Sequence, residues 1–236
     1  MVLAFHKVEP RLTWGVTNYS PGRFLRLLDS LPLPNQSGAA DGISLTFDDG
    51  YQSFLDYADP ALIERGFTAT IFAVSSLAGK RNSWDYSSIL APSAHMTATE
   101  LKRCILHGHR VQSHGKTHRD LRSLSDRELK DELAGSKDWI ENVTEEEVCE
   151  ICYPFGLYDR RVEDVAKEVG YKRGWSMNPR DKGPFTYGRW CVYGYDTPLT
   201  VNAKLSPDSF ASKLEFLKLR ATNGMARAGR FAFWTT

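Results

Sequence analysis

Four short segments in this sequence, three of them rich in apolar residues, end directly on residues that carry chemistry. They are Val2–Phe5, Ile43–Phe47, Arg110–Ser113 and Val148–Tyr153, and they are followed by His6, Asp48-Asp49, His114 and Pro154-Phe155-Gly156. Short runs with β-branched and aromatic side chains predict β-strands. Polar groups placed just past the ends of several strands are typical of the active end of a parallel β/α barrel.

Helical patterns separate these predicted strands. Thr97 with Glu100, and Ser125 with Glu128, fit the capping box that opens a helix, and apolar residues at helical spacing follow each pair. The segment 159–169 predicts a further helix, which ends at a glycine. Strands that alternate with helices predict an α/β fold with a mainly parallel sheet.

The length and charge of the chain bound its class. At 236 residues and 42% hydrophobic composition it can bury a large core, so we expect one domain over residues 1–236. A net charge of +1 gives no sign of a strongly basic protein that binds nucleic acid or an anionic membrane. We see neither a signal peptide nor an apolar stretch of membrane-spanning length, and therefore expect a cytoplasmic protein.

The cysteines point in the same direction. The chain has four, at positions 104, 149, 152 and 191. Cys149-x-x-Cys152 lacks the second such pair that a zinc ribbon requires, and a redox role is the minor alternative. We expect reduced, half-buried thiols of a cytoplasmic protein.

Two motifs supply the parts of a hydrolytic metal site. Asp48 and Asp49 are adjacent carboxylates that point in different directions, so one can bind a metal while the other takes a proton from water. His114 and His118 share a face if they lie on one helical turn. Two imidazoles and one carboxylate leave a zinc ion with an open position for water. The alternatives are an ordinary Asp-Asp-Gly turn and an incidental histidine pair.

These residues resemble a known family. The motifs Thr46-Phe47-Asp48-Asp49-Gly50, His114-x-x-x-His118, Tyr153-Pro154-Phe155-Gly156 and Leu124-Ser125-Asp126-Arg127-Glu128-Leu129 resemble those of polysaccharide deacetylases with the NodB homology domain, carbohydrate esterase family 4. The resemblance covers about residues 1–195. It implies a single (β/α) barrel, distorted or seven-stranded, with a metal site at the C-terminal ends of the strands.

The resemblance also implies a role for each matching residue. Asp48 corresponds to the general base, and Asp49, His114 and His118 correspond to the metal ligands. The backbone N–H of Phe155 corresponds to a donor that stabilises the oxyanion. The implied cofactor is a divalent metal, Zn²⁺ first, with Co²⁺, Ni²⁺ or Fe²⁺ as alternatives.

Two departures from the family pattern concern residues that support the catalytic groups. Cys152 occupies the position of an Arg that orients the catalytic Asp in the family, and Arg189 or Arg173 are the candidate substitutes. The fourth motif, an Asp with a Trp beside the acid histidine, has no clean match. Trp175 is the candidate for its aromatic part.

A third departure concerns the acid itself. No histidine follows His118, so the C-terminal Leu-x-x-His motif of the family is absent. Leu3-Ala4-Phe5-His6 fits this motif at the N-terminus, which resembles the circularly permuted poly-N-acetylglucosamine deacetylase branch. His6 is therefore the candidate general acid, and a packed or solvent-facing imidazole is the alternative. The remaining histidines match no motif and are expected to be surface or structural: His95, His107 and His109.

Aromatic residues in a long connection are candidate sugar contacts. Residues 75–97 contain Trp84 and Tyr86, whose rings could stack on sugar faces or simply pack the loop onto the barrel. Trp175 and Arg189 complete the expected set of substrate-binding residues.

These observations predict a metal-dependent hydrolase that removes N-acetyl groups from an amino sugar or a polysaccharide precursor. The expected substrate is nucleotide-linked, lipid-linked or oligomeric, and the expected pathway is surface-polysaccharide or O-antigen biosynthesis. The alternatives are an O-acetyl esterase or small-amide hydrolase on the same fold, and a catalytically inactive partner that binds metal or carbohydrate.

Overall fold

The computed structural model describes residues 1–10, 16–32, 34, 42–81, 92–206 and 209–229. The strands are β1 Val2–Phe5, β2 Lys7–Val8, β3 Asn18–Tyr19, β4 Ser44–Asp49, β5 Ala69–Ala73, β6 Arg110–Ser113, β7 Glu150–Cys152, β8 Arg173–Ser176, β9 Lys182–Gly183, β10 Thr186–Gly188 and β11 Trp190–Cys191. The α-helices are α1 Pro21–Ser30, α2 Asp59–Glu64, α3 Ala98–Leu106, α4 Asp126–Thr144, α5 Arg160–Val169, α6 Pro198–Lys204 and α7 Phe210–Gly229. Short π or 3₁₀ turns are η1 Phe54–Ala58, η2 Ser75–Leu77, η4 Leu121–Ser123 and η5 Pro154–Gly156.

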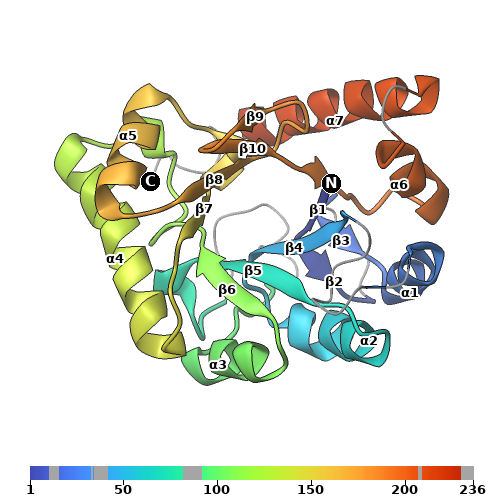
Figure 1. The fold of residues 1–236 in the computed structure, drawn as a ribbon, viewed down its shortest axis with the longest axis horizontal. Coiled ribbons are helices and arrows are strands. Elements are labelled where there is room, and N and C mark those ends of the chain that lie inside the picture. Colours follow the sequence, from blue (N-terminus) through green and yellow to red (C-terminus); the bar gives the residue numbers. More distant parts are fainter. Residues whose placement is uncertain (11–15, 33, 35–41, 82–91, 207–208, 230–236) are drawn as a thin grey trace.

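The main sheet has the strand order β11-β1-β4-β5-β6-β7-β8-β10-β9, and β9 alone pairs in antiparallel fashion. Its two ends meet in one segment of the chain. Residues 187–188 pair with β8 and residues 190–191 pair with β1, so the segment 186–191 joins both sides of the ring. The helices lie outside this ring of strands (Figure 1). The predicted α/β barrel of mainly parallel strands is confirmed. If the segment 186–191 is counted as one strand, the ring has seven strands: β1, β4, β5, β6, β7, β8 and this segment.

Successive side chains of β4 point alternately to the hydrophobic core outside the ring and to the interior of the barrel. Phe47 faces outward, where its ring packs 5.3 Å from that of Phe5 and 4.8 Å from that of Phe54, measured between centroids. Thr46 and Asp48, on the opposite face, contact polar groups inside the ring. Because successive side chains of a strand point to opposite faces, one short strand supports the hydrophobic core and delivers a carboxylate to the interior.

The predicted helix starts are confirmed by their caps. Thr97 and Ser125 cap α3 and α4 through complete capping boxes with Glu100 and Glu128. The side chain of Asp159 caps α5, and that helix ends on Gly170 with φ +98°, a conformation that favours glycine. These caps fix the residue at which each helix begins. The connections that follow α3 and α4 then lead into β6 and β7.

The C-terminal part contains a longer helix than the sequence indicates. Apolar residues at helical spacing predict an amphipathic helix over residues 214–220, and α7, which contains this segment, runs from residue 210 to residue 229. The terminal strand predicted over residues 230–234 lies outside the described residues. All four cysteines are free thiols. In the described part of the chain, no helix is long and apolar enough to cross a membrane.

Candidate active site

The polar residues singled out in the sequence converge at one end of the barrel. Asp48 and Asp49 are the last residues of β4, and His114 directly follows β6. Phe155 lies in η5 after β7, and His6 follows β1. Since these strands run parallel, their C-terminal ends share one edge, which brings together side chains from distant parts of the sequence.

Asp49, His114 and His118 form a compact, buried donor group. Nε2 of His114 lies 3.5 Å from Oδ1 of Asp49, and Nε2 of His118 lies 3.4 Å from the same oxygen. These distances are too long for good hydrogen bonds. Ligands about 2.0–2.1 Å from one tetrahedral ion would be separated by roughly 3.3 Å, so the observed spacing fits a shared zinc-like cation.

The tautomer of His114 suits this role. Its Nδ1–H donates to the backbone carbonyl of Cys152 at 2.7 Å, which leaves the Nε2 lone pair directed to Asp49. Burial lowers the pKa of His114, and it lowers the pKa of His118 well below the ordinary value. Both imidazoles are therefore neutral at pH 7, which is the form that binds metals.

The loop that carries the two histidines is held by α4. The buried carboxylate of Glu132 accepts the backbone N–H of Thr117 at 2.6 Å and its hydroxyl at 2.8 Å. A Cβ on Gly115 would lie 3.1 Å from Glu132, and Gly115 has φ +80°. The expectation that the histidine pair lies on one helical turn is wrong, because residues 114–120 form a loop and His118 adopts φ +62°.

Left-handed backbone is concentrated at this site. Asp49, His118 and Phe155 have φ values of 70°, 62° and 58°, and the fourth non-glycine residue with positive φ in the described part of the chain is Glu145, which caps α4. Such conformations cost of order 1–2 kcal/mol for an L-residue. The surrounding contacts thus hold three site residues in geometries that a free chain would avoid.

Arg189 fixes the carboxylate of Asp48, the neighbour of Asp49 in the sequence. Its Nη1 and Nη2 donate to Oδ1 and Oδ2 of Asp48 at 2.7 and 2.8 Å, and Nη1 also donates to the Thr46 hydroxyl at 3.0 Å. Burial alone would raise the pKa of Asp48, but the charge and hydrogen bonds of Arg189 outweigh it and hold that pKa well below its usual range. Asp48 is therefore an oriented carboxylate at pH 7.

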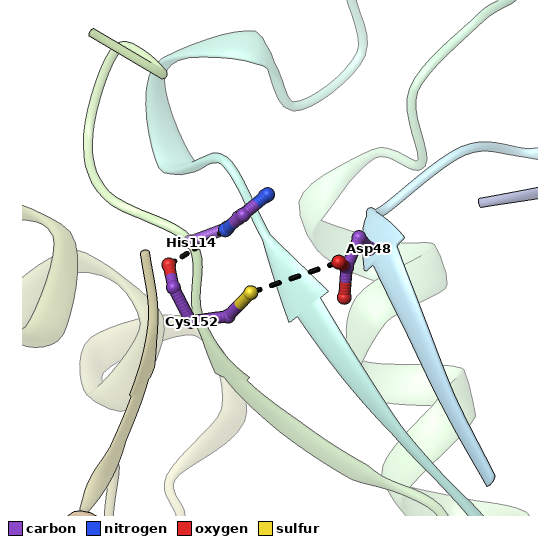
Figure 2. A group of neighbouring side chains, drawn as sticks. All are labelled: Asp48, His114 and Cys152. Atoms are coloured by element: carbon purple, nitrogen blue, oxygen red, sulfur yellow. Dashed lines mark hydrogen bonds between the residues drawn. The ribbon is translucent and has the colours of Figure 1, made fainter. Parts of the chain in front are cut away.

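Cys152 contacts this ion pair with its side chain. Figure 2 shows Asp48, His114 and Cys152 pointing toward one another from the ends of their strands. The Sγ atom lies 2.8 Å from Nη2 of Arg189 and 3.6 Å from Oδ2 of Asp48. Burial raises the pKa of the thiol well above its usual value, so it stays neutral. Because Arg189 occupies both oxygens of Asp48, this trio is a support for the carboxylate rather than a second metal site.

His6 borders the same cluster. Its imidazole interacts electrostatically with Asp48 and with both other site histidines. Burial lowers the pKa of His6 to about 4, against the opposing effect of Asp48. Its Nδ1 is buried and has no hydrogen-bond partner among the described residues. This agrees with the lack of a recognisable fourth motif, whose acidic member would orient that nitrogen.

Two residues on neighbouring loops complete the surroundings. The ring of Phe155 packs edge-on against His118, with centroids 4.6 Å apart. His95 lies 2.9 Å from the backbone oxygen of Asp49 through Nδ1, and its ring stacks on Tyr51 at 4.6 Å. Sequence reasoning missed this role of His95, because no motif or spacing connects it to the aspartate pair.

The expected substrate contacts need correction. Arg189 is fully buried and bound to Asp48, so it supports the carboxylate instead of contacting a sugar. Trp175 donates its indole N–H at 2.7 Å to Glu150, the first residue of β7, and therefore faces the opposite end of the barrel. Trp84 and Tyr86 lie outside the described residues.

The other candidate arginine is also excluded. Arg173 begins β8, its side chain is 57% exposed, and its nearest carboxylate is Glu150 at 3.7 Å. Of the two arginines considered, Arg189 thus contacts Asp48, and it does so from the strand segment that closes the ring.

Comparison with known proteins agrees with this geometry. A family model described as polysaccharide deacetylase matches residues 35–174, which is more than half of the chain. The chain belongs to the polysaccharide deacetylase family. The Bacillus subtilis protein YxkH is 27% identical to it over 180 residues, which cover 75% of this chain and 57% of YxkH. The chain therefore spans little more than half the length of that curated relative.

Solved structures show the same fold. The Streptococcus pyogenes deacetylase PplD, in complex with acetate, has a TM-score of 0.72 at 19% identity and covers 87% of this chain and 97% of its own. BC0361, a polysaccharide deacetylase from Bacillus cereus, has a TM-score of 0.71 at 22% identity and covers 87% and 68%. IcaB from Ammonifex degensii has a TM-score of 0.65 at 17% identity and covers 81% and 91%.

Proposed function

We propose that this chain is a metal-dependent N-deacetylase that hydrolyses the acetamido group of an amino sugar or of a polysaccharide precursor. The observation that carries the proposal is the donor group of Asp49, His114 and His118 beside an Asp48 carboxylate anchored by Arg189. Membership of the polysaccharide deacetylase family supports the reaction class. The bond broken is the amide C–N bond, and the products are acetate and a primary amine.

Asp49, His114 and His118 would hold a divalent cation, for which zinc suits two imidazoles and one carboxylate best. When bound, such a cation polarises a carbonyl oxygen and makes water more acidic. The residues around the ligands preorganise them: the Cys152 carbonyl orients His114, and Glu132 holds the loop that leads to His118.

Asp48 is assigned as the general base. Its low pKa means that it is a carboxylate at pH 7, and the two bonds from Arg189 fix its orientation. A base must lie within hydrogen-bond reach of the proton that it removes, and Asp48 directly precedes the ligand Asp49 on β4. Asp48 would remove a proton from the water that attacks the acetyl carbonyl.

The backbone N–H of Phe155 is assigned as an oxyanion donor. Phe155 packs on His118, so its peptide belongs to the same cluster of groups. Donors aimed at the charge that develops in the transition state are worth about 3–4 kcal/mol each in comparable sites.

His6 is assigned as the general acid. With its pKa lowered to about 4, the imidazole is neutral at pH 7 before the reaction begins. The negative charge of the tetrahedral intermediate would raise the proton affinity of a buried imidazole. His6 would then take up the equivalent of the proton that Asp48 removes from water and donate it to the departing amine nitrogen as the C–N bond breaks.

The proposed substrate is nucleotide-linked, lipid-linked or oligomeric, in surface-polysaccharide or O-antigen assembly. Trp84 and Tyr86 stay as proposed sugar contacts, since stacking on an aromatic ring is a common way to hold a pyranose face. A cytoplasmic location would favour the activated precursors over the finished polymer.

Acetate release from N-acetylhexosamine oligomers and nucleotide sugars tests this function. The zinc-loaded chain should release acetate and generate one amine per acetate, and a chelator should abolish the activity until zinc is restored. Asp48→Asn and His6→Ala should each lower kcat by about 100-fold or more. His114→Ala should lose zinc and activity together.

Two other outcomes would replace the proposal. Acetate release from O-acetylated sugars without formation of an amine would assign an esterase. Stoichiometric binding of zinc and of glycan with no turnover on any substrate of the panel would assign a binding partner that has lost catalysis.

A further inference from the structure

Helix α7 has two faces of different character. The face that packs on the rest of the molecule contains Phe216, Leu219 and Asn223, all buried. Asn223 donates to the Met177 carbonyl at 3.3 Å, and α7 also contacts η5. These contacts fix the helix against the barrel, so its opposite face is directed outward.

The outward face is apolar along its centre. Phe210, Leu214 and Leu217 are 76%, 47% and 60% exposed, and Ala221 is exposed as well. Their spacing of four, three and four residues places them in one row. Single exposed apolar side chains are normal on a protein surface. A continuous row of them on one helix indicates a surface that binds another molecule or a membrane.

The flanks of this row are basic. Between residues 210 and 224, the charged side chains at exposed positions are Lys213, Lys218 and Arg220, and none is acidic. Helical spacing puts Lys213 and Arg220 on one flank and Lys218 on the other. Glu215, the one acidic residue of this stretch, is on the buried face and pairs with Lys218 at 2.9 Å.

From this pattern we infer that the outer face of α7 is a docking surface for an anionic lipid bilayer. A helix with a row of Phe and Leu between basic flanks lies in the plane of the bilayer surface, with its apolar row in the acyl boundary and its cations among the head groups. Positive flanks select an anionic surface. The net charge of +1 conceals this local asymmetry, because charges elsewhere on the chain cancel it.

Docking at this face would hold the candidate site close to the lipid. Helix α7 contacts η5, the turn that carries Phe155. The width of one helix therefore separates Phe155 from the docking face. A helix is about 10–12 Å across. The inference concerns binding alone and holds whether or not the proposed reaction is correct.

Co-sedimentation with vesicles tests the inference. The full chain is mixed with vesicles of phosphatidylcholine containing about one third phosphatidylglycerol, or with vesicles of phosphatidylcholine alone, at low ionic strength. The test variants are F210S/L217S for the apolar row and K213Q/R220Q for the flank. L106S is the matched control, since Leu106 is 80% exposed at the end of α3.

The wild-type chain and L106S should pellet with the anionic vesicles and much less with the neutral ones. F210S/L217S should bind at least about tenfold more weakly. K213Q/R220Q should bind about 25-fold more weakly, at about fivefold for each basic residue. Circular dichroism and the thermal midpoint check that each variant is folded.

Three results would overturn the inference. The first is no pelleting of the wild-type chain with anionic vesicles at low ionic strength. The second is equal binding by the wild-type chain and folded F210S/L217S. The third is a wild-type dimer, measured by light scattering, that F210S/L217S converts to a monomer, since a second copy would then cover the row.

Discussion

Arg189 and Asp48 are 141 residues apart in the chain, yet the guanidinium of one meets both carboxylate oxygens of the other inside the barrel, at 2.7 and 2.8 Å. Arg189 lies between β10 and β11, in the segment that pairs with β8 on one side and β1 on the other. The residue that orients the proposed base therefore sits where the ring of strands closes. Formation of the barrel and preparation of the site depend on the same segment.

Arg189→Met should destabilise the protein and inactivate it. Removal of one partner of a buried ion pair leaves an uncompensated charge and costs about 3–5 kcal/mol of unfolding free energy. Asp48, still buried, would then be protonated and could no longer act as a base. Urea denaturation should show the loss of stability, and acetate release should fall by about 100-fold or more.

The double variant Asp48→Asn/Arg189→Met separates charge from packing. Without the carboxylate, the loss of the guanidinium should cost less, so the double variant should be more stable than Arg189→Met alone. Arg173→Met is the matched control, because this exposed arginine lies at the other end of the barrel. Equal stability losses in Arg173→Met and Arg189→Met would contradict the assigned role.

Glu132→Ala should weaken binding of zinc without changing any ligand. The carboxylate accepts two hydrogen bonds from Thr117, which directly precedes His118. Loss of such supporting contacts typically lowers metal affinity by 10–100-fold. Titration calorimetry on the metal-free protein measures the change. Asp138→Ala, at an exposed position of the same helix, is the control and should bind zinc like wild type.

The parts of the site that are local in sequence could be predicted from sequence. β4 alternates apolar and polar residues and ends on the two aspartates, so its faces follow from the period of a strand. The helix starts at Thr97 and Ser125 follow from capping chemistry within four residues. Each of these features depends on contacts between near neighbours in the chain.

Features set by long-range packing could not be predicted in this way. A spacing of four suggests a helical turn for His114 and His118, but the loop instead takes its shape from a contact with α4, contributed by Glu132. The small side chain of Cys152 leaves room for the guanidinium of Arg189, which comes from a distant segment of the chain. The sequence shows Cys152, but it does not show that Arg189 fills the space beside it. His95 reaches Asp49 across 46 residues.

Phe155→Asn and Phe155→Val should differ in activity. Asn tolerates the left-handed φ of 58°, whereas a β-branched residue does not. Both keep the backbone N–H, but Val should distort its direction at a cost of about 1–2 kcal/mol. We expect Asn to retain kcat/KM within about tenfold and Val to lose substantially more. Equal activities would indicate that the conformation of this peptide is unimportant for the reaction.

The stability of the metal-free protein should fall as the pH decreases from about 6.5 to about 4. Burial lowers the pKa of His6 from 6.5 to about 4 and also lowers that of His109. The unfolded chain therefore binds protons at these histidines first, and acid favours unfolding with a slope of up to about 1.4 kcal/mol per pH unit for each histidine. Urea denaturation in chelator at several pH values measures this slope. His6→Gln removes one titrating group and should flatten it, so an unchanged slope would show that His6 does not titrate as its burial requires.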